Sequence, residues 1–265
     1  MNKSFFCLLL FTGIFFSSCV PQQDLIYLQD KNNSENIQAV NAVASKPYRL
    51  QTNDILSITI KAIDPKLVEM FNQTNVPQQT GTTTSDQGLY FNGFTVDDHG
   101  NIRIPILDEV NVLGLTLEEA RQKIEKQLLD EYFKTEANIF VNLKLAGFRY
   151  TINGEVTTPG SRVLFQEKVN IMEAIANSGD ITITGDRKDV IVIRQQPHGT
   201  EMHSIDLTDV RAMQSPYYHL QPNDYIYIKP LKQKSWGTGT TGVQSLTTII
   251  SVLTLVTTTV LLLTR

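Results

Sequence analysis

Cysteine is almost absent from this sequence of 265 residues: only Cys7 and Cys19 occur, both near the N-terminus. The rest of the chain has no thiol, which excludes an internal disulfide, a thiolate zinc site and a cysteine nucleophile. Basic residues are also few. With 23 Lys and Arg against 27 Asp and Glu, the net charge is −4. Because no basic cluster breaks this balance, nucleic acid is not a predicted partner.

Histidine, proline and glycine are scarce as well. The 4 histidines form no pair at a metal-ligand spacing, so the sequence predicts no metal site and no cofactor. Only 10 prolines and 15 glycines accompany 41% hydrophobic residues, which excludes a collagen-like or disordered chain. The length suits two small folded domains with additional segments.

The N-terminus has the order of a secretory signal peptide. Lys3 precedes an apolar run over residues 5–16, and two serines then lead to Cys19. The run is too short to span a bilayer permanently, so residues 1–18 are predicted to be cleaved. The ending resembles a bacterial lipobox, which predicts lipidation of Cys19; the alternative is that cleavage falls elsewhere and this cysteine is incidental. Residues 19–45 lack sustained periodicity and are predicted to be a tether.

The C-terminus is uncharged over a long distance. No Asp, Glu, Lys or Arg occurs from Ser235 to Thr264, and residues 246–264 are Leu, Ile, Val and Thr with a single Ser. A helix rises about 1.5 Å per residue, so this segment would be roughly 28 Å long, close to the hydrocarbon thickness of a bilayer. We therefore expect a transmembrane helix over 246–264, after a joint rich in Gly and Thr over 232–245.

Polar side chains recur along this segment at helical spacing. Intervals of 3, 4, 3 and 4 residues place them on one stripe, with aliphatic residues opposite. In a ring of helices, the stripe would face a water-filled lumen and the aliphatic side would face lipid. Two alternatives stay open: the hydroxyls can bond to their own helix backbone, and the β-branched content also suits a strand. The lumen-facing stripe comprises Gln244, Thr247, Ser251, Thr254 and Thr258, and the lipid-facing side comprises Ile249, Val252, Val256, Val260 and Leu263.

The central part of the chain contains an internal repeat. Residues 48–60 and 218–230 share a Tyr, a Leu-Gln pair, an Asn-Asp pair and an Ile in the same register. Each copy predicts a turn followed by a strand. Asp54 and Asp224 occupy matching positions, and we expect each to close its turn through backbone N–H groups rather than to act in catalysis.

Between and after these copies, the patterns predict two small α+β domains. The first would contain a hairpin over 94–106, a helix from Thr116 to about Asp130 that begins with a capping box to Glu119, and a strand over 138–145.

The second domain would contain two strands over 148–164, a short helix between Asn170 and Gly179, a buried strand over 188–195 and a closing strand at 225–228. One short helix against four or five strands is a β-grasp-like plan.

The order of these motifs points to a known family. The motifs are the Tyr48–Ile60 turn and strand, the Val96–Pro105 hairpin, Gly114-Leu115-Thr116, Gly154-Glu155-Val156 with Pro159-Gly160, the helix end from Glu173 to Gly179, and Asn223-Asp224 through Pro230. Together they resemble the outer-membrane polysaccharide export (Wza-like, OPX) lipoproteins, over nearly the whole mature chain. Other details look most like members from gut-type Bacteroidetes.

The resemblance implies a fold class and a domain organisation. It implies an α+β chain with an N-terminal polysaccharide-export domain over 46–146 and a β-grasp-like SLBB domain over 147–231. A C-terminal amphipathic transmembrane helix over 246–264 would follow. Only one β-grasp copy is evident here, whereas some members of the family carry two.

The resemblance also implies a function. In this family the lipoprotein assembles into a homo-oligomeric ring whose C-terminal helices form a barrel through the outer membrane. The chain would be a non-enzymatic conduit that exports capsular or exopolysaccharide. It would be lipid-anchored in the outer membrane, with most of its mass in the periplasm. The implied partners are the polysaccharide cargo and an inner-membrane chain-length-determining co-polymerase, with or without a tyrosine kinase.

A lipid-anchored periplasmic protein that binds or modifies glycans is the alternative. A glycan-hydrolysing enzyme needs two carboxylates across a cleft. The candidate pairs, Asp97-Asp98 and Glu118-Glu119, are instead adjacent residues at a turn tip and a helix start, where solvation and the helix dipole explain them. The striped C-terminal helix favours the conduit, because neither an enzyme nor a binding protein that already carries a lipid needs it.

Overall fold

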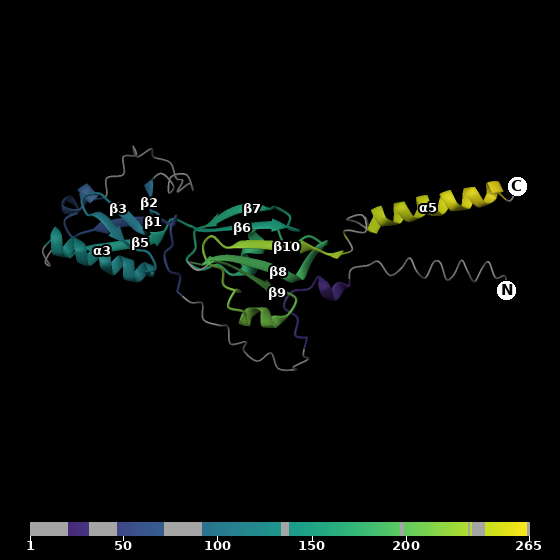
Figure 1. The fold of residues 1–265 in the computed structure, drawn as a ribbon, viewed down its shortest axis with the longest axis horizontal. Coiled ribbons are helices and arrows are strands. Elements are labelled where there is room, and N and C mark those ends of the chain that lie inside the picture. The colour runs from purple at the N-terminus through teal and green to yellow at the C-terminus, as the bar shows by residue number, and fades with distance from the viewer. Residues whose placement is uncertain are drawn as a thin grey trace. The chain divides into compact units, whose positions relative to one another are not determined.

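A computed structural model of the chain describes residues 21–31, 47–71, 92–133, 138–196, 199–232, 234 and 242–263. The chain divides into two compact units (Figure 1). The first unit comprises Ala44–Arg149 and Arg162–Val169, and the second comprises Met1–Val43, Tyr150–Ser161 and Asn170–Arg265. Each unit combines helix with sheet, which confirms the predicted α+β class.

The first unit is built around strand β1 (Ile55–Lys61). This strand pairs antiparallel with the short β2 (Phe94–Thr95) on one side and with β5 (Phe140–Leu145) on the other. Two short 3₁₀ helices, η2 (Pro65–Leu67) and η3 (Glu69–Phe71), follow β1.

Helix α3 (Leu117–Glu131) supplies one side of the first unit's core. Its Ala120, Ile124 and Leu128 recur at helical spacing and are buried with residues of the strands. The predicted capping box is confirmed, because the Thr116 hydroxyl accepts the Glu119 N–H at 3.2 Å and Glu119 accepts the Thr116 N–H at 2.8 Å. These two bonds satisfy N–H groups that the first helical turn would otherwise leave unpaired.

The predicted hairpin over 94–106 is wrong in its pairing. β2 pairs with β1, whereas β3 (Asn101–Ile104) pairs with β4 (Asp108–Asn111) in a separate two-stranded sheet. The turn between β2 and β3 forms as predicted: Asp97 Oδ1 accepts the backbone N–H groups of His99 and Asn101, both at 2.8 Å. The residues before and after that turn then pair with different strands, a choice that depends on contacts outside the segment.

A five-stranded sheet has the order β7, β6, β10, β8, β9, and most of its residues belong to the second unit (Figure 1). The strands are β6 (Phe148–Gly154), β7 (Gly160–Leu164), β8 (Gly185–Gln196), β9 (Gly199–Ile205) and β10 (Tyr225–Pro230). The central β10 is parallel to β6 and antiparallel to β8. Gly154 ends β6 with φ of +94°, and a Cβ there would lie 2.0 Å from the Ile228 carbonyl oxygen. Only glycine therefore permits this close strand end.

Helix α4 (Ile171–Asn177) buries Ile171, Ala174 and Ile175. A second capping box, between Asn170 and Glu173, begins the helix as predicted. The buried Tyr150 of β6 donates its hydroxyl to the Ala174 carbonyl at 3.0 Å, which joins the helix to the sheet. A 3₁₀ helix, η5 (Val210–Gln214), precedes β10. One short α-helix with a five-stranded mixed sheet matches the predicted β-grasp-like plan.

Helix α5 (Gly242–Leu263) follows the second unit's last strand in sequence. A C-terminal helix was predicted, and it begins at residue 242 rather than 246. Among the residues that the structure describes, no helix combines the length and the apolar character needed to cross a membrane. The predicted transmembrane segment over 246–264 is thus not supported. Ser and Thr account for 8 of the 22 residues of α5.

Candidate functional site

The N-terminal segment, residues 21–31, is bound to the second unit. It contains the 3₁₀ helix η1 (Gln22–Asp24), and Leu28 and Gln29 then donate their N–H groups to the carbonyls of Leu207 and Thr208 at 3.0 and 2.8 Å. The Val210 N–H donates back to Gln29 at 3.1 Å. The prediction of a tether over 19–45 is therefore wrong for residues 21–31. The rest of the predicted tether, and Cys19 itself, lie outside the described residues.

The Tyr27 side chain contacts two residues of the second unit. Its hydroxyl donates to Asp180 Oδ1 at 2.5 Å, and the Arg187 guanidinium carbon lies 5.2 Å from its ring centroid. Burial and the bond to Asp180 raise the pKa of the Tyr27 hydroxyl, so it stays protonated and keeps donating. Sequence periodicity missed this segment. The available signal was the apolar run from Leu25 to Leu28 within polar neighbours.

Two ion pairs hold the ends of the segment. Lys188 Nζ lies 2.6 Å from Asp24, and Lys31 Nζ lies 2.7 Å from Asp206 and 2.8 Å from the Thr208 hydroxyl. Each pair is partly exposed, so each contributes only modestly to stability. Together with the backbone bonds and Tyr27, they make residues 24–31 a fixed part of the second unit.

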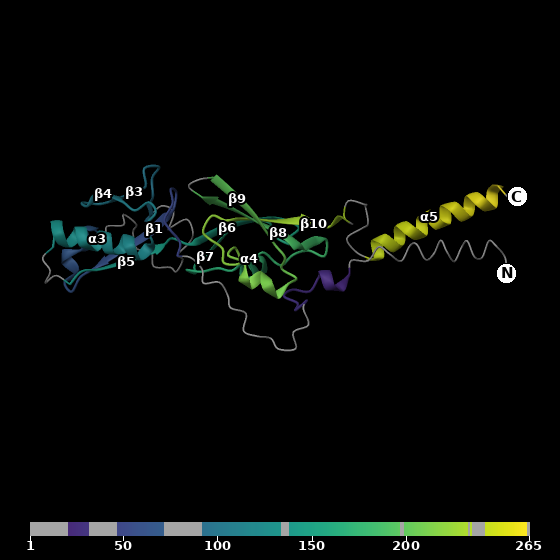
Figure 2. The ribbon, with the colours of Figure 1, turned by 60° about the horizontal axis from the view of Figure 1, so that its bottom comes forward.

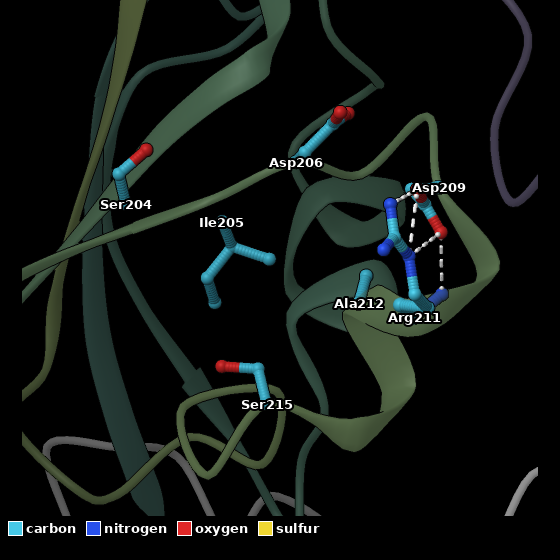
Figure 3. Close-up of a pocket in the computed structure, with 7 residues that line it drawn as sticks. All are labelled: Ser204, Ile205, Asp206, Asp209, Arg211, Ala212 and Ser215. Atoms are coloured by element: carbon cyan, nitrogen blue, oxygen red, sulfur yellow. Dashed lines mark hydrogen bonds and ion pairs between the residues drawn. The ribbon is translucent and has the colours of Figure 1, made fainter.

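An open pocket lies beside this contact (Figure 3). Its lining residues come from β9 and from the turn and 3₁₀ helix that follow: Ser204, Ile205, Asp206, Asp209, Arg211, Ala212 and Ser215. Figure 3 shows Asp209 and Arg211 turned toward one another, and the Arg211 Nη2 lies 2.6 Å from Asp209.

The polar groups of this pocket are already engaged within the chain. Asp206 is bonded to Lys31, Ser204 donates to Asp189 at 2.6 Å, and the Ser215 hydroxyl accepts the Tyr217 N–H at 3.3 Å. Arg211 lowers the pKa of Asp209, so this carboxylate is ionised and paired at neutral pH. A ligand would have to replace these bonds, and the pocket therefore does not identify a sugar site.

The striped residues lie on α5 as the sequence predicted. Thr247, Ser251, Thr254 and Thr258 are exposed, but so are Val252 and Val256 on the opposite side. Ile249 is half-buried, and Gln244, Val260 and Leu263 also lie in α5. In a single chain, residues on both sides of α5 are thus exposed. Their exposure does not distinguish a lumen face from a lipid face.

The hydroxyls of α5 donate to carbonyls of their own helix. Ser251 donates to the Thr247 carbonyl at 2.8 Å, Thr254 to Ile250, and Thr258 to Leu255 at 3.1 Å. This is one of the two alternatives that the sequence left open, since these donors need no water. The other alternative, a strand, is excluded by the helical backbone.

The two aspartates of the repeat close turns, as predicted. Asp54 Oδ2 accepts the Gln51 N–H at 2.8 Å, and Asp224 Oδ2 accepts the Gln221 N–H at 2.7 Å. The asparagine before each has the same φ of 68°, a left-handed conformation that Asn tolerates. Asp224 differs in one respect, because the buried Arg194 donates to both of its oxygens at 2.9 and 2.7 Å.

The carboxylate pairs considered for catalysis also have structural partners. Glu119 belongs to the capping box, and the bond from the Thr116 backbone N–H lowers its pKa. Hydrogen bonds from Arg121 lower the pKa of Glu118 to about 2. Asp97 accepts the backbone bonds of its turn. Within the described ranges, no group of three or more His, Cys, Asp or Glu side chains has an arrangement that could hold a metal ion.

Comparison with family models divides the chain in two. Residues 42–144 match the model described as polysaccharide biosynthesis/export protein, and residues 149–228 match the SLBB domain. The first match contains β1 to β4, α3 and all but the last residue of β5. The second match extends from the second residue of β6 to the fourth residue of β10. Both matches stand in the order that the sequence motifs predicted.

Two curated relatives agree with the family models. Each is named EPS I polysaccharide export outer membrane protein EpsA, one from Ralstonia nicotianae and one from Ralstonia solanacearum. The chain is 28% identical to the first over 149 residues, 56% of this chain and 39% of the relative, and 28% identical to the second over 169 residues, 60% and 42% respectively. It thus spans about two fifths of the length of these relatives. The two domains in this order, with relatives of this kind, show that the chain belongs to the outer-membrane polysaccharide export family.

Proposed function

We propose that this protein is an outer-membrane lipoprotein that assembles into a ring-shaped conduit and exports capsular or exopolysaccharide from the periplasm to the cell surface. The observation that carries the proposal is the succession of an export domain and an SLBB domain along the chain. Two relatives named as polysaccharide export outer membrane proteins support the same cargo and the same membrane. The family is one of export proteins, not of enzymes.

Lipidation of Cys19 is the proposed means of attachment. The signal-peptide pattern ends at this cysteine, and the mature chain would contain no other thiol. Since a single acyl chain gives only reversible membrane binding, stable attachment requires more than one chain or a second contact. Most of the mass, including both folded units, would then lie in the periplasm.

The passage for the polysaccharide is proposed to form between copies of the chain. In a ring, the stripe of Thr247, Ser251, Thr254 and Thr258 would line the hydrated passage, and the aliphatic side with Val252 and Val256 would face away from it. Hydroxyl oxygens retain acceptor capacity after donating to the helix backbone, so water and sugar hydroxyls can still bond to them. Synthesis and an inner-membrane co-polymerase, with or without a tyrosine kinase, would drive the chain through.

Deleting the gene is expected to remove polysaccharide from the cell surface, and the detergent-purified protein is expected to form closed rings in particle images. Complementation with the full chain is the control for the surface signal. Images of monomers only, or surface polysaccharide unchanged in the deletion strain, would contradict the conduit.

The two sides of α5 are expected to react differently in assembled protein. Thr254→Cys should react with a membrane-impermeant thiol reagent, because a lumen-facing position stays hydrated, whereas Val256→Cys should not. Acylated Cys19 would not react, so each variant carries one reporter thiol, and the parent chain is the control for background labelling. Equal labelling of both variants would indicate a helix surrounded by water. Absence of labelling in both would indicate that no hydrated passage reaches the helix.

A further inference from the structure

The N-terminal segment and the segment that follows β10 both contact residues at or next to the beginning of β8. On the N-terminal side, Asp24 pairs with Lys188, near the first residue of that strand. On the C-terminal side, Pro230 pairs with Gly185, and the Leu231 N–H donates to the Thr184 carbonyl at 2.8 Å. Figures 1 and 2 show η1 and the end of β10 at the same end of this sheet in both views.

The segment that follows β10 is also attached to the second unit. Lys234 forms an ion pair with Glu155, and Glu155 also accepts the hydroxyls of Thr182 and Thr184 at 3.0 and 2.7 Å. The contacts of Tyr27 with Asp180 and Arg187 lie at this end too. The polypeptide on both sides is therefore held in place up to this end of the unit.

Two large apolar side chains are exposed beside these attachments. Ile183 stands in the turn closed by the Gly185 N–H and the Thr182 carbonyl, and it is 56% exposed. Ile26 precedes Tyr27 and is 44% exposed. The Arg187 guanidinium contacts a sequence neighbour of each isoleucine. It donates to the carbonyl of Thr182, which precedes Ile183, at 3.2 Å, and it lies over the ring of Tyr27, which follows Ile26. Ile26 and Ile183 are thus each adjacent in sequence to a residue that contacts Arg187.

The length of chain before this end limits its distance from the lipid. From Cys19 to Ile26 the chain advances seven residues, which span at most roughly 24 Å when fully extended at about 3.4 Å each. If Cys19 is acylated, Ile26 can lie no farther than this from the residue that carries the lipid, and Arg187 connects the turn with Ile183 to the neighbouring Tyr27. Exposed apolar residues at such a position lose water-exposed surface when they enter the lipid interface.

We propose that this end of the second unit is a membrane-contacting surface, in which Ile26 and Ile183 enter the headgroup region of the leaflet that holds the lipid of Cys19. The inference rests on the acylation of Cys19 that the proposed function includes. The surface adds a second contact to the lipid anchor. It also orients the sheet, with the beginning of β8 toward the membrane.

The test uses the full-length acylated protein in vesicles of phosphatidylethanolamine and phosphatidylglycerol. Ile183→Cys is labelled with an environment-sensitive fluorophore, and the vesicles contain lipids with a nitroxide quencher in the headgroup. The matched control is Met202→Cys, which is 62% exposed on β9 and pairs with Ile193. Ile193 is eight residues from Gly185 along β8, so the control lies about 26 Å away at ~3.3 Å per residue.

We expect the lipid-borne quencher to reduce fluorescence at position 183, and likewise in Ile26→Cys, but not at position 202. Equal quenching at 183 and 202 would overturn the proposed orientation. A label at 183 that is shielded from both aqueous iodide and the lipid quencher would indicate a contact with another copy of the chain. If the fluorophore at position 183 is not quenched while the acylated protein floats with the vesicles, the proposed membrane contact is refuted and the lipid anchor stands. If Cys19 is unmodified and the protein does not float, the anchor and the surface fail together.

Discussion

Truncation of the chain after Lys234 is expected to abolish polysaccharide export and to leave both units folded. The hydroxyls of Ser251, Thr257 and Thr259 donate to carbonyls within α5 itself. The truncated chain keeps the Leu231 bond to Thr184 and the Lys234 pair with Glu155. The helix is therefore dispensable for the fold but required for the proposed passage. Surface polysaccharide, measured by immunostaining of cells, reports export, and protease resistance of the truncated protein reports folding.

A matched control separates the presence of α5 from its pattern. A variant with the same composition, but with the Ser and Thr residues distributed around the helix, has no stripe. If the stripe lines the passage, this variant should also fail to export while reaching the same cellular level. Export by the truncated protein would refute a role for α5, and export by the redistributed variant would refute the stripe alone.

Asp224→Ala is expected to destabilise the second unit by about 3–5 kcal/mol, the cost typical of breaking a buried ion pair. The Asp224 and Arg194 side chains are 1% and 7% exposed, and the guanidinium donates twice to the carboxylate. Burial raises the pKa of Asp224, while Arg194 and the Gln221 N–H oppose that shift. Removing the carboxylate leaves a buried guanidinium without its partner. Hydrogen exchange of β8 and β10 amides in the full-length protein measures the loss.

The repeat provides the control for this variant. Asp54→Ala removes the acceptor of two neutral donors, the Tyr48 hydroxyl and the Gln51 N–H, both at 2.8 Å, and its expected cost is about 1–3 kcal/mol. Adding Arg194→Met to Asp224→Ala should recover part of the stability, because the unpaired charge is then gone. A cost for Asp224→Ala below about 1 kcal/mol, as for an exposed pair, would contradict the prediction.

Local chemistry explains which features the sequence could predict. The capping boxes at Thr116 and Asn170 depend on residues three positions apart, and both form. The turns at Asp54 and Asp224 also depend on neighbours, and they form as expected. Such bonds depend only on residues that are close together in the sequence. The α+β class follows from the helices and turns that they define.

Features that depend on distant partners could not be predicted in the same way. Tyr27 bonds to Asp180, 153 positions later, and no local periodicity shows such a contact. The strand at Phe94 pairs with β1 instead of its neighbour β3 for the same reason. In the candidate site, the positions of the hydroxyls on α5 followed from helical spacing, but their bonding to the helix backbone could only be left as an alternative.

The docking of residues 21–31 sets an order of events during secretion. On the proposed route the N-terminus crosses the inner membrane first, whereas the partner of Lys31, Asp206, lies 175 positions later in the chain. The segment therefore reaches the periplasm long before its docking surface exists. Cleavage and acylation at Cys19 would act on an extended, unpaired stretch, and the segment would become part of the second unit only after translocation is nearly complete. The N-terminal segment would thus be accessible for processing at Cys19 during translocation. After docking, it would be a fixed spacer between the lipid and the second unit.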